Sequence, residues 1–301
     1  MTEVGRTLAV DLGGTRMRAA VVMPDGEVCS RRAIATPQDA ACPDALMELA
    51  GDVLAAADVG EAVIGVPGRV DHRHGRLEHA PNLPPHWPGA LDERLLAERF
   101  GLPVSLANDA DLAAVGEAYF GAARAYTDVV YLTVSTGVGA GVLLDRRLVA
   151  GARSLAEVGH TVIDRTAGLG GQHATFETLG SGTALERLAG DAGLPADGAR
   201  IVELVHAGDP HATRVWDEVV AVIATGVANL AFLFTPEVIV LGGGVGRNGD
   251  LLVPVLRAHL DSNGPPGLPV PIEVVVAELG DDAGLVGAGA WRRATRKPGD
   301  G

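Results

Sequence analysis

The sequence has 301 residues, of which 47% are hydrophobic and 21% charged, so it can bury the cores of two ordinary domains. Its net charge of -14 excludes an extended basic face for nucleic acid, because acidic side chains repel phosphate backbones. Only Cys29 and Cys42 are present, which excludes a disulfide framework and fits a reducing cytoplasm.

Two glycine-rich hairpins open similar halves of the chain. Residues 7–10 form a short apolar run, the turn DLGGT follows, RMRAAVVM reads as a second strand, and 27–35 reads as a third. The same layout returns from Val129, with DVVYLTV, the turn STGVGAG and the strand VLL. This repeat predicts a duplicated architecture.

Alternating strands and helices fill the remaining sequence and predict α/β layers. We expect helices at 43–57, from Asn108-Asp109 towards Tyr119, within 181–234 and at 283–295, strands at 62–66, 104–107, 238–241 and 272–277, and long loops at 67–88 and 151–176. The uncharged run 219–234 is shorter than the roughly 20 residues that span a membrane, which predicts a buried core helix. Residues 298–301 are expected to be a disordered tail.

The first hairpin turn is suited to holding phosphate groups. Gly13, Gly14 and Thr15 allow the backbone N–H groups to approach a polyphosphate, and Asp11 is placed to hold Mg²⁺ through water. A strand follows this turn, so neither the Walker loop nor the dinucleotide fingerprint applies. A tight hairpin turn without a ligand would explain the same residues.

A second candidate loop combines hydroxyl groups with unobstructed amides, at Ser135, Thr136, Gly137, Gly139 and Gly141. A third glycine run, Gly242-Gly243-Gly244, follows the apolar strand VIVL and would let an adenine ring or a ribose lie against the backbone. A turn into the next helix explains this third run equally well.

Asn108-Asp109 stands where a strand ends and a helix begins, which is a usual place for active-site groups in α/β proteins. A carboxylate at that place can accept the proton of an attacking hydroxyl during phosphoryl transfer. Glu157, His160 and Glu177 carry the acidic and imidazole groups that hydrogen-bond sugar hydroxyls. A helix cap and exposed loop residues are the alternative interpretations.

Several imidazoles and one carboxylate lie close together in the first half of the chain, at Asp71, His72, His74, His79 and His86. Their spacing matches no standard metal site. We therefore expect solvated loop histidines there.

The chain resembles the ROK family of bacterial sugar kinases. The motifs DLGGTRMRAAVV, VIGVPGRVD, PNLPPHW, LANDAD, STGVGAG, EVGH, FETLGSGTAL and VIVLGGGV occur in the family's order from Leu8 to about Trp291. The resemblance implies the actin-like ATPase (ribonuclease H-like) fold, with two α/β domains flanking a cleft for ATP and sugar. Residues 1–118 with 284–297 would form the first domain, and residues 119–283 the second.

The resemblance also implies roles for individual residues. Asp109 would be the catalytic base. The sugar would contact Gly68, Asn82, Asn108, Asp109, Glu157, His160 and Glu177. Phosphates would bind at Gly13, Gly14, Thr15 and Arg16 and at Thr136, Gly137 and Gly139, while Gly243 and Gly244 would approach the adenosine.

The sequence departs from the family at its usual zinc site, which takes the histidine of EVGH and three cysteines. Gly168, Gly170 and Thr175 stand in place of the three thiolates, so His160 lacks the partners of a tetrahedral site, and we expect no structural zinc. Ala156 replaces a common glycine, and Arg16 a common lysine whose charge it keeps.

The expected activity is ATP-dependent phosphorylation of glucose or a close relative, at the 6-hydroxyl, with Mg²⁺. An amino sugar such as kanosamine or N-acetylmannosamine is an alternative substrate, and a non-catalytic sugar-sensing regulator or scaffold is an alternative of another class. We expect a homodimer without nucleic-acid or membrane partners.

Overall fold

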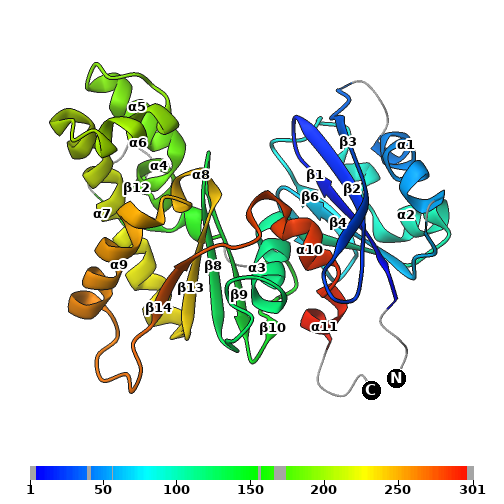
Figure 1. Cartoon of the computed structure of the whole chain (residues 1–301). Helices are drawn as coiled ribbons and strands as arrows, with labels where there is room; N and C mark the ends of the chain where they lie inside the picture. Colours follow the sequence, from blue (N-terminus) through cyan, green and yellow to red (C-terminus); the bar gives the residue numbers. More distant parts are fainter. Residues whose placement is uncertain (1–4, 39–41, 56, 155–156, 166–173, 297–301) are drawn as a thin grey trace. The chain divides into compact units, whose positions relative to one another are not determined.

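The computed structural model describes residues 5–38, 42–55, 57–154, 157–165 and 174–296 (Figure 1). The chain divides into two compact units. Unit 1 comprises residues 1–127, 141–155 and 281–301, and unit 2 comprises residues 128–140 and 156–280. The C-terminal segment therefore belongs to the unit that contains the N-terminal segment.

A five-stranded sheet with the order β3-β2-β1-β4-β7 forms the centre of unit 1. Its strands are β1 (Thr7–Leu12), β2 (Arg16–Val22), β3 (Val28–Ala35), β4 (Glu61–Val66) and β7 (Val104–Asn108). The first hairpin pairs β1 and β2 antiparallel from Thr7↔Val22 to Leu12↔Met17. β4 and β7 continue the sheet in parallel with β1, so their carboxyl ends meet at one edge.

Helices and short elements complete unit 1. They are α1 (Cys42–Ala55), η1 (Pro88–Ala90), α2 (Glu93–Phe100), α3 (Asp109–Tyr119), η3 (Gly280–Asp282), α10 (Ala283–Ala288) and α11 (Trp291–Thr295). The core of this sheet takes in Leu46 and Leu49 of α1 and Leu96 of α2, together with the fully buried Trp87. Burial of these apolar side chains holds the helices on the sheet.

Helices α3 and α10 approach each other closely because each carries a glycine at the contact. A Cβ at Gly287 would lie 1.9 Å from the carbonyl oxygen of Leu112, and one at Gly116 would lie 2.3 Å from that of Ala283. Neither position has room for a side chain. The helix that begins with Asp109 is therefore packed against a segment from the far end of the sequence.

The second sheet has the order β10-β9-β8-β13-β14. Its strands are β8 (Val129–Val134), β9 (Val138–Leu144), β10 (Arg147–Leu148), β13 (Val238–Gly242) and β14 (Glu273–Val276). Its order matches that of the first sheet. Three strands consecutive in the chain, β10-β9-β8, stand in the place of β3-β2-β1, and β13 and β14, which run parallel to β8, stand in the place of β4 and β7. The predicted duplication is confirmed.

The helices of unit 2 follow the second hairpin along the chain. They are η2 (Val158–His160), α4 (Phe176–Gly180), α5 (Gly182–Asp191), α6 (Gly198–His206), α7 (Pro210–Phe234), α8 (Gly243–Gly246) and α9 (Gly249–Asn263). By length and composition alone α7 could cross a membrane, but half of its most apolar window is buried. It packs against α4, α5, α6 and α9, as predicted for a core helix.

Three predicted boundaries were wrong, each for a local reason. The loop 67–88 contains the hairpin of β5 (Arg69–Asp71) and β6 (Arg76–His79), and the loop 151–176 contains the pair β11 (Val162–Asp164) and β12 (Ala174–Thr175). These short strands have no extended period-2 pattern. The predicted final helix breaks between α10 and α11.

The second glycine turn is also shorter than predicted, because Ser135 N–H donates to the Gly137 carbonyl and β9 already begins at Val138. Gly139 and Gly141 consequently lie in a strand. Gly141 is required there by packing, since its Cβ would lie 2.5 Å from the Cβ of Ala114 in α3.

A partly buried carboxyl group in α2 makes stability depend on pH. Glu93 Oε1 accepts a hydrogen bond from Leu106 N–H at 2.8 Å. Burial raises the pKa of Glu93 above its usual 4.5; the Leu106 hydrogen bond opposes this rise and the Asp92 charge adds to it. The folded protein thus binds this proton more tightly than the unfolded chain. The free energy of unfolding therefore falls as pH rises from 4.5, the usual pKa, through the raised pKa of the folded state.

Glu93→Gln keeps an acceptor oxygen for Leu106 and removes the ionisable group. We expect the variant to gain stability relative to the wild type as pH rises from 4.5 towards neutrality. Urea unfolding of both proteins across that range measures the difference. A stability difference that stays constant with pH would contradict the assignment.

Candidate active site

The first glycine hairpin, the candidate phosphate-binding turn of unit 1, is closed and is bonded to the end of a neighbouring strand. Gly13 N–H donates to the Arg16 carbonyl at 2.9 Å, and Thr36 Oγ1 donates to the Gly13 carbonyl at 2.6 Å. Thr36 N–H also donates to the carbonyl of Thr15 at 3.0 Å. The turn geometry is therefore fixed by the protein itself before any ligand binds.

Asn82, which is predicted to bind sugar, lies against this hairpin. A Cβ at Gly14 would lie 2.3 Å from the carbonyl oxygen of Asn82, so only glycine allows the two backbone segments to meet. Asn82 belongs to the PNLPPHW motif. The structure thus brings a predicted phosphate-binding residue and a predicted sugar-binding residue together within unit 1.

Asp11, the candidate for a water-mediated Mg²⁺ contact, is held by an arginine that sequence reasoning missed. Arg18 Nε and Nη2 donate to Asp11 Oδ2 at 3.0 and 2.5 Å, and Nη2 also donates to the carbonyl of Asp281 at 2.7 Å. Arg18 further pairs with Asp282, which Arg31 binds as well. With Oδ2 bound to Arg18, Asp11 fits an indirect contact with Mg²⁺ better than a direct one.

Asn108 and Asp109 occupy the junction of β7 and α3, as predicted. Asn108 is the N-cap of α3, with Oδ1 accepting from Ala110 N–H at 2.9 Å, while its Nδ2 donates to the Gly68 carbonyl at 3.0 Å. Gly68 has a φ of 128°, which disfavours any side chain. Asp109 Oδ1 accepts from Ala110 N–H at 2.9 Å. The interpretation of Asn108 as a helix cap and that of Asp109 as a functional group are therefore compatible, because Asn108 caps the helix that begins with Asp109.

The second phosphate loop, in unit 2, is fixed from the side of α5. The Ser135 carbonyl accepts from Gly182 N–H at 2.6 Å, and the Thr136 carbonyl accepts from Thr183 Oγ1 at 2.8 Å. Gly182 and Thr183 belong to the FETLGSGTAL motif, which marked this segment in the sequence without indicating its contact. Engagement of the two carbonyls from behind holds the short turn in place.

Glu177 also contacts this loop. Its Oε2 accepts a hydrogen bond from Val138 N–H at 3.0 Å, and a Cβ at Gly137 would lie 2.5 Å from the same oxygen. Glu157 and His160 lie apart from that contact, with 3.8 Å between Glu157 Oε2 and His160 Nε2, and both side chains are exposed. The three predicted sugar residues of unit 2 thus have different partners.

A hollow of about 510 Å³ in unit 2 begins at this phosphate loop. It is lined by Ser135, Thr136, Gly182, Thr183, Leu185, Glu186, Asp197, Gly198, Ala199, Val202, Gly244, Val245, Arg247 and Asn248. Gly243 has a φ of 82°, and a Cβ there would lie 2.4 Å from the Val134 carbonyl. The third glycine run therefore lets the chain turn directly from β13 into the wall of the hollow, whose size suits a nucleoside.

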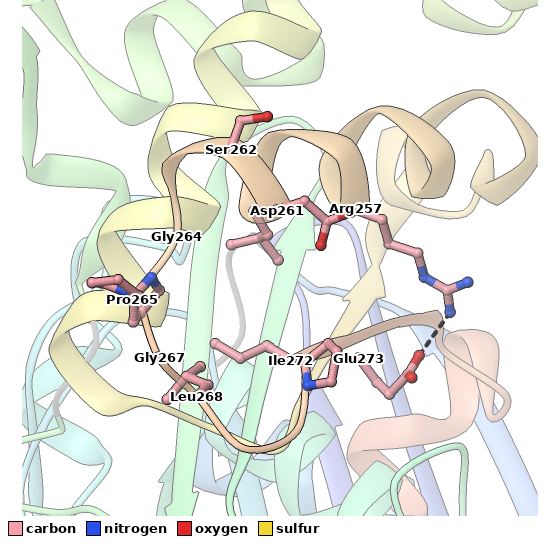
Figure 2. A pocket seen from close by; sticks show the side chains of 12 residues that line it. Arg257, Asp261, Ser262, Gly264, Pro265, Gly267, Leu268, Ile272 and Glu273 are labelled. Atoms are coloured by element: carbon pink, nitrogen blue, oxygen red, sulfur yellow. Dashed lines mark hydrogen bonds and ion pairs between the residues drawn. The ribbon is translucent and has the colours of Figure 1, made fainter.

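Another hollow, of about 520 Å³, lies between α9 and the proline-rich segment before β14 (Figure 2). Arg257 and Glu273 form an ion pair at its edge, with 2.9 Å between Nη2 and Oε2. It contains none of the predicted site residues.

The histidine-rich loop of unit 1 is a structural turn. Asp71 Oδ1 accepts from the N–H groups of Arg73 and His74, and Oδ2 lies 2.6 Å from His74 Nδ1. The His74 hydrogen bond lowers the pKa of Asp71, and burial lowers the pKa of His72. Among the described residues, no three His, Cys, Asp or Glu side chains are grouped to hold a metal ion.

The family's zinc site does not fit the donors that this chain offers. Thr175, in place of a thiolate, is the N-cap of α4 and forms a capping box with Thr178, in which its Oγ1 accepts from Thr178 N–H. A neutral hydroxyl committed to a helix cap is a poor zinc ligand. Gly168, Gly170 and Ala156 lie outside the described residues.

Comparisons with known proteins identify the relatives of this chain. A model of the ROK family matches residues 7–295. The chain is 32% identical to the glucokinase of Thermotoga maritima, over 94% of this chain and 96% of the relative. It is 33% identical to the N-acetylmannosamine kinase of Yersinia pseudotuberculosis, over 97% of this chain and all of the relative.

The solved structures include a ROK family glucokinase from Streptomyces griseus in complex with glucose and AMPPNP. It is 33% identical, with a TM-score of 0.77, over 96% of this chain and 99% of that one. The predicted fold class is confirmed.

Proposed function

Because this chain belongs to the ROK family, we propose that it is an ATP-dependent sugar kinase that phosphorylates glucose or a close relative, at the 6-hydroxyl. One observation carries the proposal. In each unit an amino acid predicted to bind sugar contacts a turn predicted to bind phosphate: Asn82 lies against Gly14, and Glu177 accepts a hydrogen bond from Val138 N–H. These contacts are expected in a protein that brings a sugar hydroxyl close to a phosphoryl group.

In this proposal Asp109 is the general base. Its carboxylate accepts the proton of the attacking hydroxyl, while Asn108, Gly68 and Asn82 orient the sugar from unit 1. Glu157, His160 and Glu177 are proposed to bind further sugar hydroxyls.

The backbone amides of the two glycine turns stabilise charge on the phosphoryl oxygens. Thr15 and Arg16 assist the first turn. Thr136 and Gly137 belong to the second turn, and Gly139 follows it in β9. Mg²⁺ supplies neutralising charge when bound, with Asp11 acting through water. Within the protein, Val138 N–H is bound to Glu177 and Ser135 N–H to the Gly137 carbonyl.

The hollow beside Gly244 is the proposed adenosine site. Its wall includes Gly244, whose Cβ position is free of contact with any described atom within 4 Å, so a ribose or base can lie against the backbone. We further propose that the protein is a cytoplasmic homodimer, which the resemblance supports. We also propose that it has no structural zinc, which the commitment of Thr175 to the α4 cap supports.

A coupled ADP-release assay with ATP and Mg²⁺ tests the function against glucose, mannose, fructose, allose, glucosamine, kanosamine and N-acetylmannosamine. We expect ADP release that depends on glucose or a neutral relative. Turnover of only an amino sugar would favour the alternative, with which the N-acetylmannosamine kinase relative agrees. Absence of sugar-dependent ADP release with all of these sugars would overturn the kinase proposal. Metal analysis of the same preparation should find no tightly held zinc.

A further inference from the structure

The Glu177 carboxylate stands between a sugar-binding segment and a phosphate-binding segment of unit 2. One oxygen, Oε2, accepts from Val138 N–H at 3.0 Å and lies against the backbone of Gly137. An ionised carboxylate has two oxygens and about four lone-pair directions, so Oε1 retains acceptor capacity for a sugar hydroxyl. A single side chain can therefore contact both ligand-binding segments at once.

The carbonyl group of Val138 also has a close neighbour, in the EVGH segment. A Cβ at Gly159 would lie 2.3 Å from the Val138 carbonyl oxygen and 3.3 Å from Glu177 Cβ. Gly159 sits between Glu157 and His160 in the EVGH motif. The two segments that carry the predicted sugar-binding residues of unit 2 thus approach the same residue, Val138, which directly follows the second glycine turn.

Glu177 is presented by a short helix with a fixed position. Thr175 and Thr178 cap α4, and Phe176 N–H donates to the Thr161 carbonyl at 2.9 Å. The Phe176 side chain is 1% exposed, and a Cβ at Gly226 would overlap its ring, at 2.2 Å from Cε1. Because α4 is anchored in this way, a force on the carboxylate acts on the phosphate loop instead of rotating the helix.

We propose that Glu177 couples the two ligands: its Oε1 binds a sugar hydroxyl while its Oε2 holds the phosphate loop, so sugar and nucleotide each bind more tightly in the presence of the other. This inference rests on the proposed function. A sugar hydroxyl on Oε1 fixes the carboxylate, and the fixed carboxylate orders the amides that receive phosphate. Linkage requires the same coupling factor in both directions, and such factors commonly lie between about 5 and 150.

The test uses the sugar that is turned over fastest in the screen and consists of two calorimetric titrations. In the first, Mg-AMPPNP is titrated into the protein with and without a saturating concentration of that sugar. In the second, the sugar is titrated with and without Mg-AMPPNP. In the wild type we expect the sugar to tighten nucleotide binding about tenfold, and the reverse titration to give the same factor. Glu177→Gln has one acceptor oxygen for two donors, the Val138 N–H and the sugar hydroxyl. Its coupling factor should fall to below about twofold, whichever way the amide turns.

Glu157→Gln is the matched control. It makes the same chemical change on a predicted sugar residue whose described ion pair is with His160 and not with the phosphate loop. It should weaken sugar binding yet keep the wild-type coupling factor. Gly137→Ala alters the same contact from the second glycine turn: its Cβ would displace Glu177 Oε2, so it should lower the coupling factor whatever its effect on sugar affinity without nucleotide.

These outcomes separate the inference from the function beneath it. Sugar-dependent ADP release with a wild-type coupling factor of one would overturn the coupling and leave the kinase intact. An unchanged factor in both Glu177→Gln and Gly137→Ala, or an equal loss in Glu157→Gln, would do the same. Absence of sugar-dependent ADP release with every sugar in the screen would remove the kinase proposal itself.

Discussion

Asp109→Asn is expected to lower kcat by about 100- to 10,000-fold, the range that general-base catalysis contributes. Asparagine cannot accept the proton of the attacking hydroxyl, but its side-chain oxygen can still accept from Ala110 N–H as Asp109 Oδ1 does. The substitution should therefore leave the start of α3 and the affinity for sugar nearly unchanged. The loss should appear in kcat and in kcat/KM to a similar extent. Steady-state kinetics of sugar-dependent ADP release measures both.

Asp92→Asn is the matched control for this change. Asp92 caps α2 by accepting from the N–H groups of Arg94 and Leu95, and asparagine is an equally good N-cap. Its kcat should stay within about twofold of the wild type, as expected for a surface substitution away from the site. Wild-type kcat in Asp109→Asn would remove the proposed base, and an equal fall in Asp92→Asn would point to a general effect of the substitution.

Gly287→Ala is expected to reduce the free energy of unfolding by about 3 kcal/mol, at the upper end of the usual cost of overpacking. The new Cβ would lie 1.9 Å from the Leu112 carbonyl oxygen and 2.9 Å from the amide nitrogen of Gly116. These are backbone atoms of α3, so no side-chain rotation relieves the clash and the two helices must separate. Urea or thermal unfolding measures the loss.

Gly284→Ala provides the comparison within the same helix. Its Cβ would meet no atom of the described residues within 4 Å, and alanine favours a helix over glycine by up to about 1 kcal/mol. This variant should be as stable as the wild type or slightly more stable. Equal destabilisation by the two substitutions would show that α10 tolerates no alanine for reasons other than its contact with α3.

The sequence predicted the elements that depend on local pattern. The two glycine hairpins, the buried strands and the cap at Asn108 follow from neighbouring residues, and each is present. Short strands such as β5 and β11 have too few residues for a period to show. Their existence depends on what they pair with.

The sequence names candidate site residues but does not predict the contacts that they make. Val138 and Glu177 are 39 residues apart, and Arg18 and Asp282 are 264 apart, so no local motif states that they meet. Arg18 could have been suspected only as a charge inside the otherwise apolar strand RMRAAVV. Pairing over such distances is decided by the folded topology.

The packing of α3 against α10 has a consequence for synthesis on the ribosome. At about 5–20 residues per second, α10 is made on the order of 10 to 30 s after α3. During that time Gly116 and its neighbours lack the partner that covers them in the finished protein. Unit 1 is therefore the first to begin translation, but it can complete its packing only after the segment that contains α10 has been made.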